Sequence, residues 1–324
     1  MDYFPNEYTR QAYEKLSRAL YGVYSDALRD VEMKYSSFVY AHEKRVARYQ
    51  KQVEAGIITQ ADFEAWMQGQ IFQSETWKKR REQMAELLAH ADEQALEMVN
   101  RGKLNVFAEA ANYEAYRIER GGGANYGFGV FDDRTVSRLI HDRPQMLPMP
   151  RVDKYKDIEQ YNEMLQNAVT QGILQGENLK QIVLRATEYV SQRSYTDILR
   201  NASTAYNGAQ SAGTLARMQE AKDRGIRIRK RWNCAMMRTS RDWHAELDGQ
   251  TAELDEPFQT RLGPMMRPGD PEGVPANVYN CHCWLDEVVE GYPEGTRERR
   301  DDETGEIAPP KRYEEWKAWK DRKE

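Results

Sequence analysis

The feature that most constrains the fold is a long amphipathic pattern near the N-terminus. Over residues 7–55 the apolar side chains recur every three or four positions as far as Val31, the spacing of one buried stripe on an α-helix. No proline interrupts this pattern, and at ~1.5 Å per residue the helix would be about 70 Å long. The stripe consists of Tyr13, Leu16, Leu20, Val23, Ala27, Val31, Phe38, Val46, Tyr49 and Val53.

A short turn follows this predicted helix and leads into further helical sequence. Gly56 suits the left-handed position that ends many helices, and Thr59 with Asp62 has the spacing of a capping box. Helical patterning then continues to residue 120, with Gly102 as the expected break between two helices. We therefore predict a helical hairpin over the first 120 residues.

Glycines and prolines mark residues 121–152 as a connector. The sequence RGGGANYGFGVFDD ends at Asp133, and Pro144, Pro148 and Pro150 follow it. Because proline disfavours helical backbone at the preceding residue, we predict an irregular, extended segment here. Helical spacing returns over residues 153–225.

The periodicity changes at Gly225. In GIRIRKRWNC the side chains alternate with a period of two, which indicates a strand with one half-buried face. Ile226 and Ile228 would share one face, and Arg227 and Arg229 the other. A short helix is expected to begin at Thr239 or Ser240, and two or three more short strands are expected before residue 290.

Together these patterns predict an α+β protein, in which a long N-terminal helical hairpin and a helical bundle precede a small C-terminal β-rich module. The expected regions are the hairpin at 1–120, the connector at 121–152, a helical region at 153–225, the β-rich module at 226–290 and a charged tail at 291–324. The tail contains a stretch that suits one short amphipathic helix docked through Trp316 and Trp319.

Composition narrows the class of protein. The 324 residues include 47 basic and 52 acidic side chains, a net charge of -5, so any contact with nucleic acid would have to be local. Three cysteines, an odd number, favour a reducing compartment over a disulfide framework. The N-terminal residues lack a signal-peptide pattern and no run of 18 apolar residues occurs, so we predict neither a secretion signal nor a membrane span.

Four motifs follow one another in the C-terminal third of the chain. They are RKRWNC, then RTSRDWHAELDGQ (Arg238–Gln250), then RPGDP (Arg267–Pro271), then NCHC (Asn280–Cys283). In this order and spacing they resemble the C-terminal signature of phage minor head proteins, the Mu F-like head-morphogenesis family of tailed phages. The resemblance covers Gly176 to about Val289, and residues 1–150 carry no diagnostic motif.

The resemblance implies a structural virion component with no catalytic residues and no cofactor apart from a candidate structural zinc ion. Such proteins are assembled in the host cytoplasm, lie inside the phage head in several copies, and act at or near the portal vertex in procapsid assembly and DNA packaging. Portal protein is the implied partner, with scaffold, coat protein and packaged DNA as further partners, and some members leave the head with the DNA.

Two cysteines and a histidine raise the question of a metal. If residues 281–283 form a strand, Cys281 and Cys283 share a face that His244 could approach. A structural zinc ion needs four ligands, and Cys234 is the best fourth candidate because His282 would point to the opposite face. The sequence leaves three alternatives open: a structural zinc ion, buried reduced cysteines, and a disulfide, which a reducing compartment disfavours.

A metal-dependent nuclease of the HNH type, or a toxin-like enzyme using His244, is the alternative function. Such a centre needs a histidine base beside an acidic residue, a loop asparagine and a metal-binding histidine on a following helix. Asp242 precedes His244, and Asn277 or Asn280 could supply the loop residue, but no histidine follows His282. A bare DNA-binding or packaging factor is the third class considered.

The remaining motif residues are expected to shape the module. Gly269 and Asp270 suit a tight turn in which the glycine has a positive φ and the aspartate accepts hydrogen bonds from backbone amides. The other members of the structural motif are Trp232, Asp248, Gly249, Pro268, Pro271 and Asn280.

A basic run precedes these motifs. It is interpreted either as a solvated strand face or as a local contact with phosphate or a partner protein, which would be sensitive to salt. The residues for such a contact are Arg227, Arg229, Lys230 and Arg231.

Overall fold

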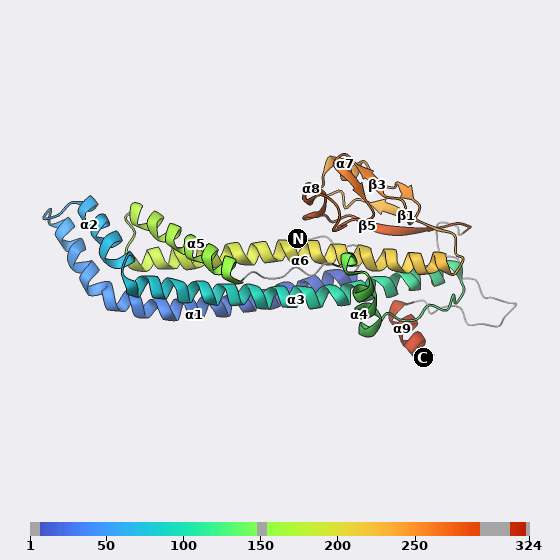
Figure 1. The fold of residues 1–324 in the computed structure, drawn as a ribbon, viewed down its shortest axis with the longest axis horizontal. Coiled ribbons are helices and arrows are strands. Elements are labelled where there is room, and N and C mark those ends of the chain that lie inside the picture. Colours follow the sequence, from blue (N-terminus) through green and yellow to red (C-terminus); the bar gives the residue numbers. More distant parts are fainter. Residues whose placement is uncertain (1–6, 148–153, 292–311, 322–324) are drawn as a thin grey trace. The chain divides into compact units, whose positions relative to one another are not determined.

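The computed structural model describes residues 7–147, 154–291 and 312–321 of the chain. The helices are α1 (Glu7–Glu54), α2 (Gln60–Trp66), the π-helix η1 (Met67–Phe72), α3 (Glu75–Gly122), α4 (Asp133–Asp142), the 3-10 helix η2 (Pro144–Met146), α5 (Lys154–Leu174), α6 (Leu179–Asp223), α7 (Asp242–Ala245), α8 (Pro275–Val278) and α9 (Tyr313–Asp321) (Figure 1). The strands are β1 (Ile228–Asn233), β2 (Thr251–Ala252), β3 (Phe258–Thr260), β4 (Gly263–Met265) and β5 (Trp284–Val289). The predicted α+β class is confirmed. None of the described helices is long and apolar enough to cross a membrane.

The chain divides into two compact units that are not contiguous in sequence. Unit 1 is formed by Met1–Leu16, Val99–Met149 and Arg200–Glu324, and unit 2 by Ser17–Met98 and Pro150–Leu199. The helices α1, α3 and α6 contribute residues to both units, because each of them is 45 to 48 residues long. The units therefore cut across the linear regions expected from the sequence.

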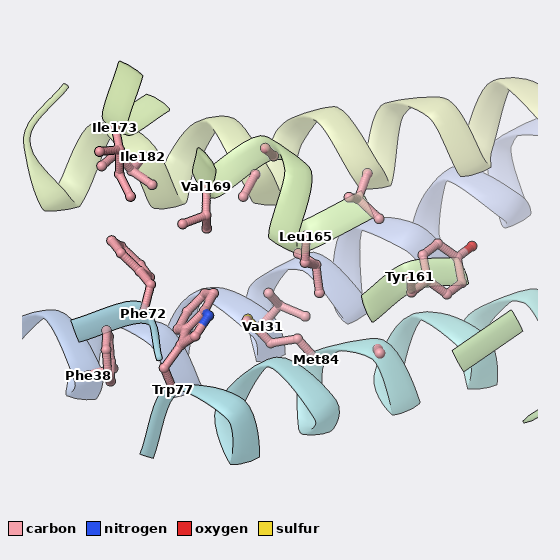
Figure 2. Close-up of a cluster of buried hydrophobic side chains, with 14 of the residues drawn as sticks. Val31, Phe38, Phe72, Trp77, Met84, Tyr161, Leu165, Val169, Ile173 and Ile182 are labelled. Atoms are coloured by element: carbon pink, nitrogen blue, oxygen red, sulfur yellow. The ribbon is translucent and has the colours of Figure 1, made fainter. Parts of the chain in front are cut away.

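Unit 2 is a helical assembly around an aromatic and aliphatic core. Trp77 is fully buried, and its ring lies 5.1 Å from that of Phe72 and 5.4 Å from that of Phe38. Figure 2 shows these rings facing Val169 and Ile173 of α5 and Ile182 of α6. The predicted stripe on α1 is confirmed here, since Val31, Phe38 and Val46 are buried in the same core.

The turn after α1 also forms as predicted. Gly56 has a φ of 68°, and the side chain of Thr59 accepts a hydrogen bond from the Asp62 amide while the Asp62 carboxylate accepts one from the Thr59 amide. This reciprocal pair satisfies two amides that the first turn of α2 would otherwise leave without acceptors.

In unit 1 the helices α3 and α6 approach each other closely at glycines. The expected break at Gly102 is wrong, because α3 runs through it without interruption. A Cβ atom at Gly102 would lie 1.8 Å from the Tyr206 hydroxyl oxygen, and one at Gly213 would lie 2.2 Å from the Phe107 carbonyl oxygen. Gly102 is therefore required by packing and does not end a helix.

The connector contains more regular structure than the sequence suggested. Asp132 caps α4 by accepting a hydrogen bond from the Thr135 amide at 2.8 Å, and η2 follows at residues 144–146. Arg217, which is fully buried on α6, fixes the start of this segment by donating hydrogen bonds to the carbonyls of Ala111 and Gly129. Pro148 and Pro150 lie outside the described residues.

The β-rich module consists of a three-stranded antiparallel sheet in the order β2-β1-β5 and a β3–β4 hairpin. Strand β1 starts at Ile228, two residues later than the first alternating residue, and Trp232 on it pairs with Leu285. Trp232, Phe258 and Leu285 lie in one core with Trp316 of α9, and Trp319 packs partly buried against that core. The indole Nε1 of Trp316 donates to Glu119 on α3 at 2.7 Å.

Candidate metal site

His244 and two cysteines come together inside the β-rich module. His244 lies on α7, whereas Cys281 and Cys283 lie in the loop between α8 and β5. The prediction that the cysteines alternate along a strand is wrong, since β5 begins at Trp284. The expected start of the short helix at Thr239 or Ser240 is also wrong, because α7 begins at Asp242 without a side-chain cap.

The geometry of this cluster matches a tetrahedral zinc site. His244 Nδ1 lies 3.6 Å from Cys281 Sγ and 3.7 Å from Cys283 Sγ, and the three ligand atoms lie within 4.8 Å of one another. With Zn–N near 2.0 Å and Zn–S near 2.3 Å, a tetrahedron requires an N–S edge of about 3.5 Å. The side chains are 1%, 2% and 3% exposed, so the site is closed to solvent.

Cys234 is the candidate for the fourth zinc ligand that the sequence indicates. It follows β1 and is 5% exposed, and it adds a small part to the rise in the pKa of Cys283 that the hydrogen bond with Cys281 and burial mainly cause. Its amide donates to Asp248 Oδ1 at 2.8 Å, which fixes the backbone at this position. Cys234 stands outside the group of three atoms that lie within 4.8 Å, so it would have to move toward them to complete a tetrahedron.

The thiols are polarised by one another and by the histidine. A hydrogen bond with Cys283, followed by one with His244, lowers the pKa of the Cys281 thiol well below its usual range. The same hydrogen bond, together with burial, raises the pKa of Cys283. A thiolate is the form that binds zinc, so Cys281 is the cysteine best prepared to act as a ligand.

The surroundings of His244 are aromatic. The ring of Trp232 lies edge-on to the imidazole at 5.4 Å, and that of Trp243 at 6.4 Å. Among the described residues His244 Nε2 has no hydrogen-bond partner, although zinc-bound histidines usually donate their second N–H to a neighbouring acceptor. Three ligand atoms therefore fit a zinc ion, whereas the described residues supply neither a fourth ligand in the cluster nor an acceptor for His244 Nε2.

The PGDP turn docks the module on α6. Gly269 has a φ of 67°, and Asp270 accepts hydrogen bonds from the amides of Met266 at 2.7 Å and Glu272 at 3.1 Å. Both roles confirm the expectation for this turn, which Pro268 and Pro271 flank. The buried Arg267, which no sequence pattern distinguishes, donates to the carbonyls of Gly208 and Gly269.

The two asparagines have separate surroundings. Asn277 is fully buried, accepts a hydrogen bond from Trp243 Nε1 at 2.9 Å and donates to Thr260 Oγ1 at 2.8 Å. Asn280 has a φ of 56°, and its amide donates to Thr204 Oγ1 on α6. Gly249, with a φ of 75°, donates its amide to the Trp232 carbonyl. These contacts are those of turn and core residues.

The basic run is divided between the core and the surface of the module. Lys230 is fully buried and donates to the carbonyls of Leu254 and Met266, so it cannot reach a phosphate. Its burial lowers its pKa to about 8. The three arginines contact other residues of the module: Arg227 contacts Glu290, Arg229 contacts Thr251, and Arg231 contacts Asp286.

Comparison with known proteins adds a family and one relative. Residues 163–286 match the family described as Phage Mu protein F like protein. The NAD(+)–arginine ADP-ribosyltransferase EFV of Enterococcus faecalis (strain ATCC 700802 / V583) is 34% identical over 172 residues, which are 52% of this chain and 33% of that protein. The chain thus spans about a third of that relative's length, and no solved structure matches significantly. Residues 163–286 are thus similar to Mu F-like phage head proteins, which agrees with the resemblance that the motifs indicate.

Proposed function

We propose that this protein is a structural component of the phage head that acts by binding other head proteins rather than by catalysis. The family match over residues 163–286 carries the proposal, because the match includes α6, the PGDP turn and the NCHC segment. Portal protein is the proposed partner, in procapsid assembly and DNA packaging at or near the portal vertex. Scaffold, coat protein and packaged DNA are further proposed partners. We also propose that each head contains several copies of the protein and that the protein leaves the head with the DNA.

The burial of the candidate site supports a structural role. A catalytic zinc site keeps one coordination position open to substrate, and a nuclease base must reach a phosphodiester. His244 is 1% exposed, and its Nδ1 faces two buried thiols. The amide group of Asn277 is engaged by Trp243 and Thr260, which leaves it unavailable to a substrate.

The same donor set supports a structural zinc ion. His244, Cys281 and Cys283, with Cys234 as the fourth ligand, would hold the ion, which would supply bonds between α7, the end of β1 and the loop before β5. These segments are joined by few strand hydrogen bonds, because β2, β3 and β4 have only two or three residues each. A metal would therefore contribute directly to the folding of this module.

Cross-linking within intact phage heads tests the proposed partner. Heads are treated with a lysine-reactive cross-linker, and linked peptides are identified by mass spectrometry. We expect links between this protein and portal protein to exceed links to coat protein when each is normalised to copy number. Links to coat protein alone would contradict an action at the portal vertex.

The Enterococcus relative raises a second candidate, transfer of ADP-ribose from NAD to arginine. The name of that relative describes this activity, but our chain spans only a third of its length, so transfer of ADP-ribose is a competing proposal here. Purified protein is incubated with labelled NAD and an arginine-rich acceptor. If the protein is structural, we expect the acceptor to carry no more label than in a control without protein. Labelling that rises with protein concentration would favour the enzyme.

A further inference from the structure

A partly buried cluster of charged side chains joins α3 to the sheet within unit 1. Arg117 of α3 lies 2.7 Å from Asp286 Oδ1 and 2.8 Å from Glu287 Oε2, both on β5. Glu114, one turn before Arg117 on α3, lies 4.0 Å from it. From β1, Arg231 lies 3.8 Å from Asp286 Oδ2, and Asn233 donates to that oxygen at 3.0 Å.

The charges in this cluster do not balance. Three carboxyl groups, Glu114, Asp286 and Glu287, face the two guanidinium groups of Arg117 and Arg231. Lys230 pairs with Glu287 in the strand register, but its ammonium group donates to the carbonyls of Leu254 and Met266 instead. If every carboxyl group were ionised, one negative charge would remain without compensation, which is costly away from water.

Two oxygen atoms show where a proton belongs. The side chain of Glu114 is 2% exposed and that of Glu287 14% exposed, and both carboxyl groups lie beside the same guanidinium group, that of Arg117. Glu114 Oε1 is buried and accepts no hydrogen bond from any described residue, whereas the buried Glu287 Oε2 has the Arg117 guanidinium beside it at 2.8 Å. Two carboxylates cannot bond to each other, whereas one added proton gives a donor and an acceptor.

We propose that Glu114 and Glu287 share one proton and thereby form a pH-sensitive clamp between α3 and strand β5. The proton removes the excess negative charge, supplies the missing hydrogen bond, and leaves Arg117 to pair with Asp286 and with the remaining negative charge. The clamp joins a strand at the edge of the sheet to the helix that it packs against.

The electrostatic surroundings agree with this assignment. Burial, followed by the neighbouring charge of Glu287, raises the pKa of Glu114 well above its usual range. Burial also raises the pKa of Glu287, against the opposing effect of Arg117. Two carboxyl groups that share a site cannot both ionise readily, so the first proton is held strongly.

The sign of the pH effect follows from these directions. In the unfolded chain both glutamates lose their protons near pH ~4.3, whereas the folded pair retains one proton above that pH. The folded state therefore binds more protons, and the contribution of the clamp is fully present below the unfolded pKa. It is lost as the pH rises toward and through the raised pKa of the pair.

Infrared spectroscopy of the full chain tests the shared proton directly. At neutral pH we expect the carbonyl band of a protonated carboxylic acid, which Glu114→Gln removes. Glu290→Gln, at the exposed residue that follows β5, is the matched control and should leave the band unchanged. Absence of the band in the wild-type protein would overturn the proposal, and this result does not depend on the folding of any variant.

Hydrogen exchange measures the consequence for packing. Corrected for intrinsic rates, protection of the peptides that contain Glu114 and β5 should fall about tenfold or more as the pH is raised from ~6 to ~9. Glu114→Gln keeps a permanent donor at this position and should remove that dependence, whereas Glu290→Gln should preserve it. The same pH dependence in wild type and Glu114→Gln would assign the effect to another group and contradict the clamp.

Discussion

Replacing Gly269 with alanine should detach the PGDP turn from α6. The residue has a φ of 67°, where an L side chain costs about 1–2 kcal/mol. A Cβ atom there would lie 2.7 Å from Gly208 Cα and 2.9 Å from Gly208 N, both backbone atoms of a helix that cannot move aside cheaply. Overpacking of this kind costs roughly 1–3 kcal/mol, so the two effects together destabilise the module by about 2–5 kcal/mol.

Gly249→Ala separates the two contributions. Gly249 lies in the same module with a φ of 75°, but nothing lies within 4 Å of the Cβ position. The Gly249→Ala variant should therefore be destabilised only by backbone strain, at a cost of ~1–2 kcal/mol. Gly208→Ala tests the contact from the helix side, since its Cβ would lie 2.9 Å from the Gly269 carbonyl oxygen without any unfavourable φ.

The assay is calorimetric unfolding of the full chain, with hydrogen exchange of the peptides around residues 208 and 269. We expect Gly269→Ala to be more destabilising than Gly249→Ala and to lose protection at both peptides. A folded protein typically has only ~5–15 kcal/mol of stability, so the larger loss should be readily measured. Equal destabilisation by the two substitutions would refute the close approach of this turn to α6.

Two further predictions concern the candidate metal site. Elemental analysis of protein purified without chelators should find one zinc per chain, with Cys281→Ser losing it and Ser240→Ala, outside the ligand set, retaining it. A strong chelator should then unfold the β-rich module, whereas metal-free protein with unchanged stability would support buried reduced cysteines. Purified protein should not cleave DNA with magnesium, manganese or zinc, and metal-dependent nicking that His244→Ala abolishes would support the nuclease alternative.

The sequence predicts features that depend on local spacing. The stripe from Tyr13 to Val53 defines α1, because burial of one helix face places an apolar residue at every third or fourth position of the sequence. The capping box at Thr59 and the positive φ of Gly269 follow from the chemistry of three or four neighbouring residues. His244, Cys281 and Cys283 were selected on motif spacing, and the structure brings them together.

Features that depend on distant partners are missed. Gly102 resembles a helix breaker in sequence, and only the Tyr206 hydroxyl pressed against it explains why a glycine stands inside α3. Lys230 resembles a surface residue in a basic run, yet two carbonyls from loops 24 and 36 positions away hold it in the core. The pair of Glu114 and Glu287 is separated by more than half of the chain, and no local pattern connects them.

The most direct test of the central claim is the composition of heads made with and without this protein. Heads are purified from cells infected by phage that carry or lack the gene, and their proteins and packaged DNA are quantified. We predict that the protein is present at a fixed number of copies in wild-type heads, and that its loss lowers the yield of DNA-filled heads while coat protein and tails are made normally. Absence of the protein from wild-type heads, or a normal yield of filled, infectious heads without it, would contradict a structural role in the head.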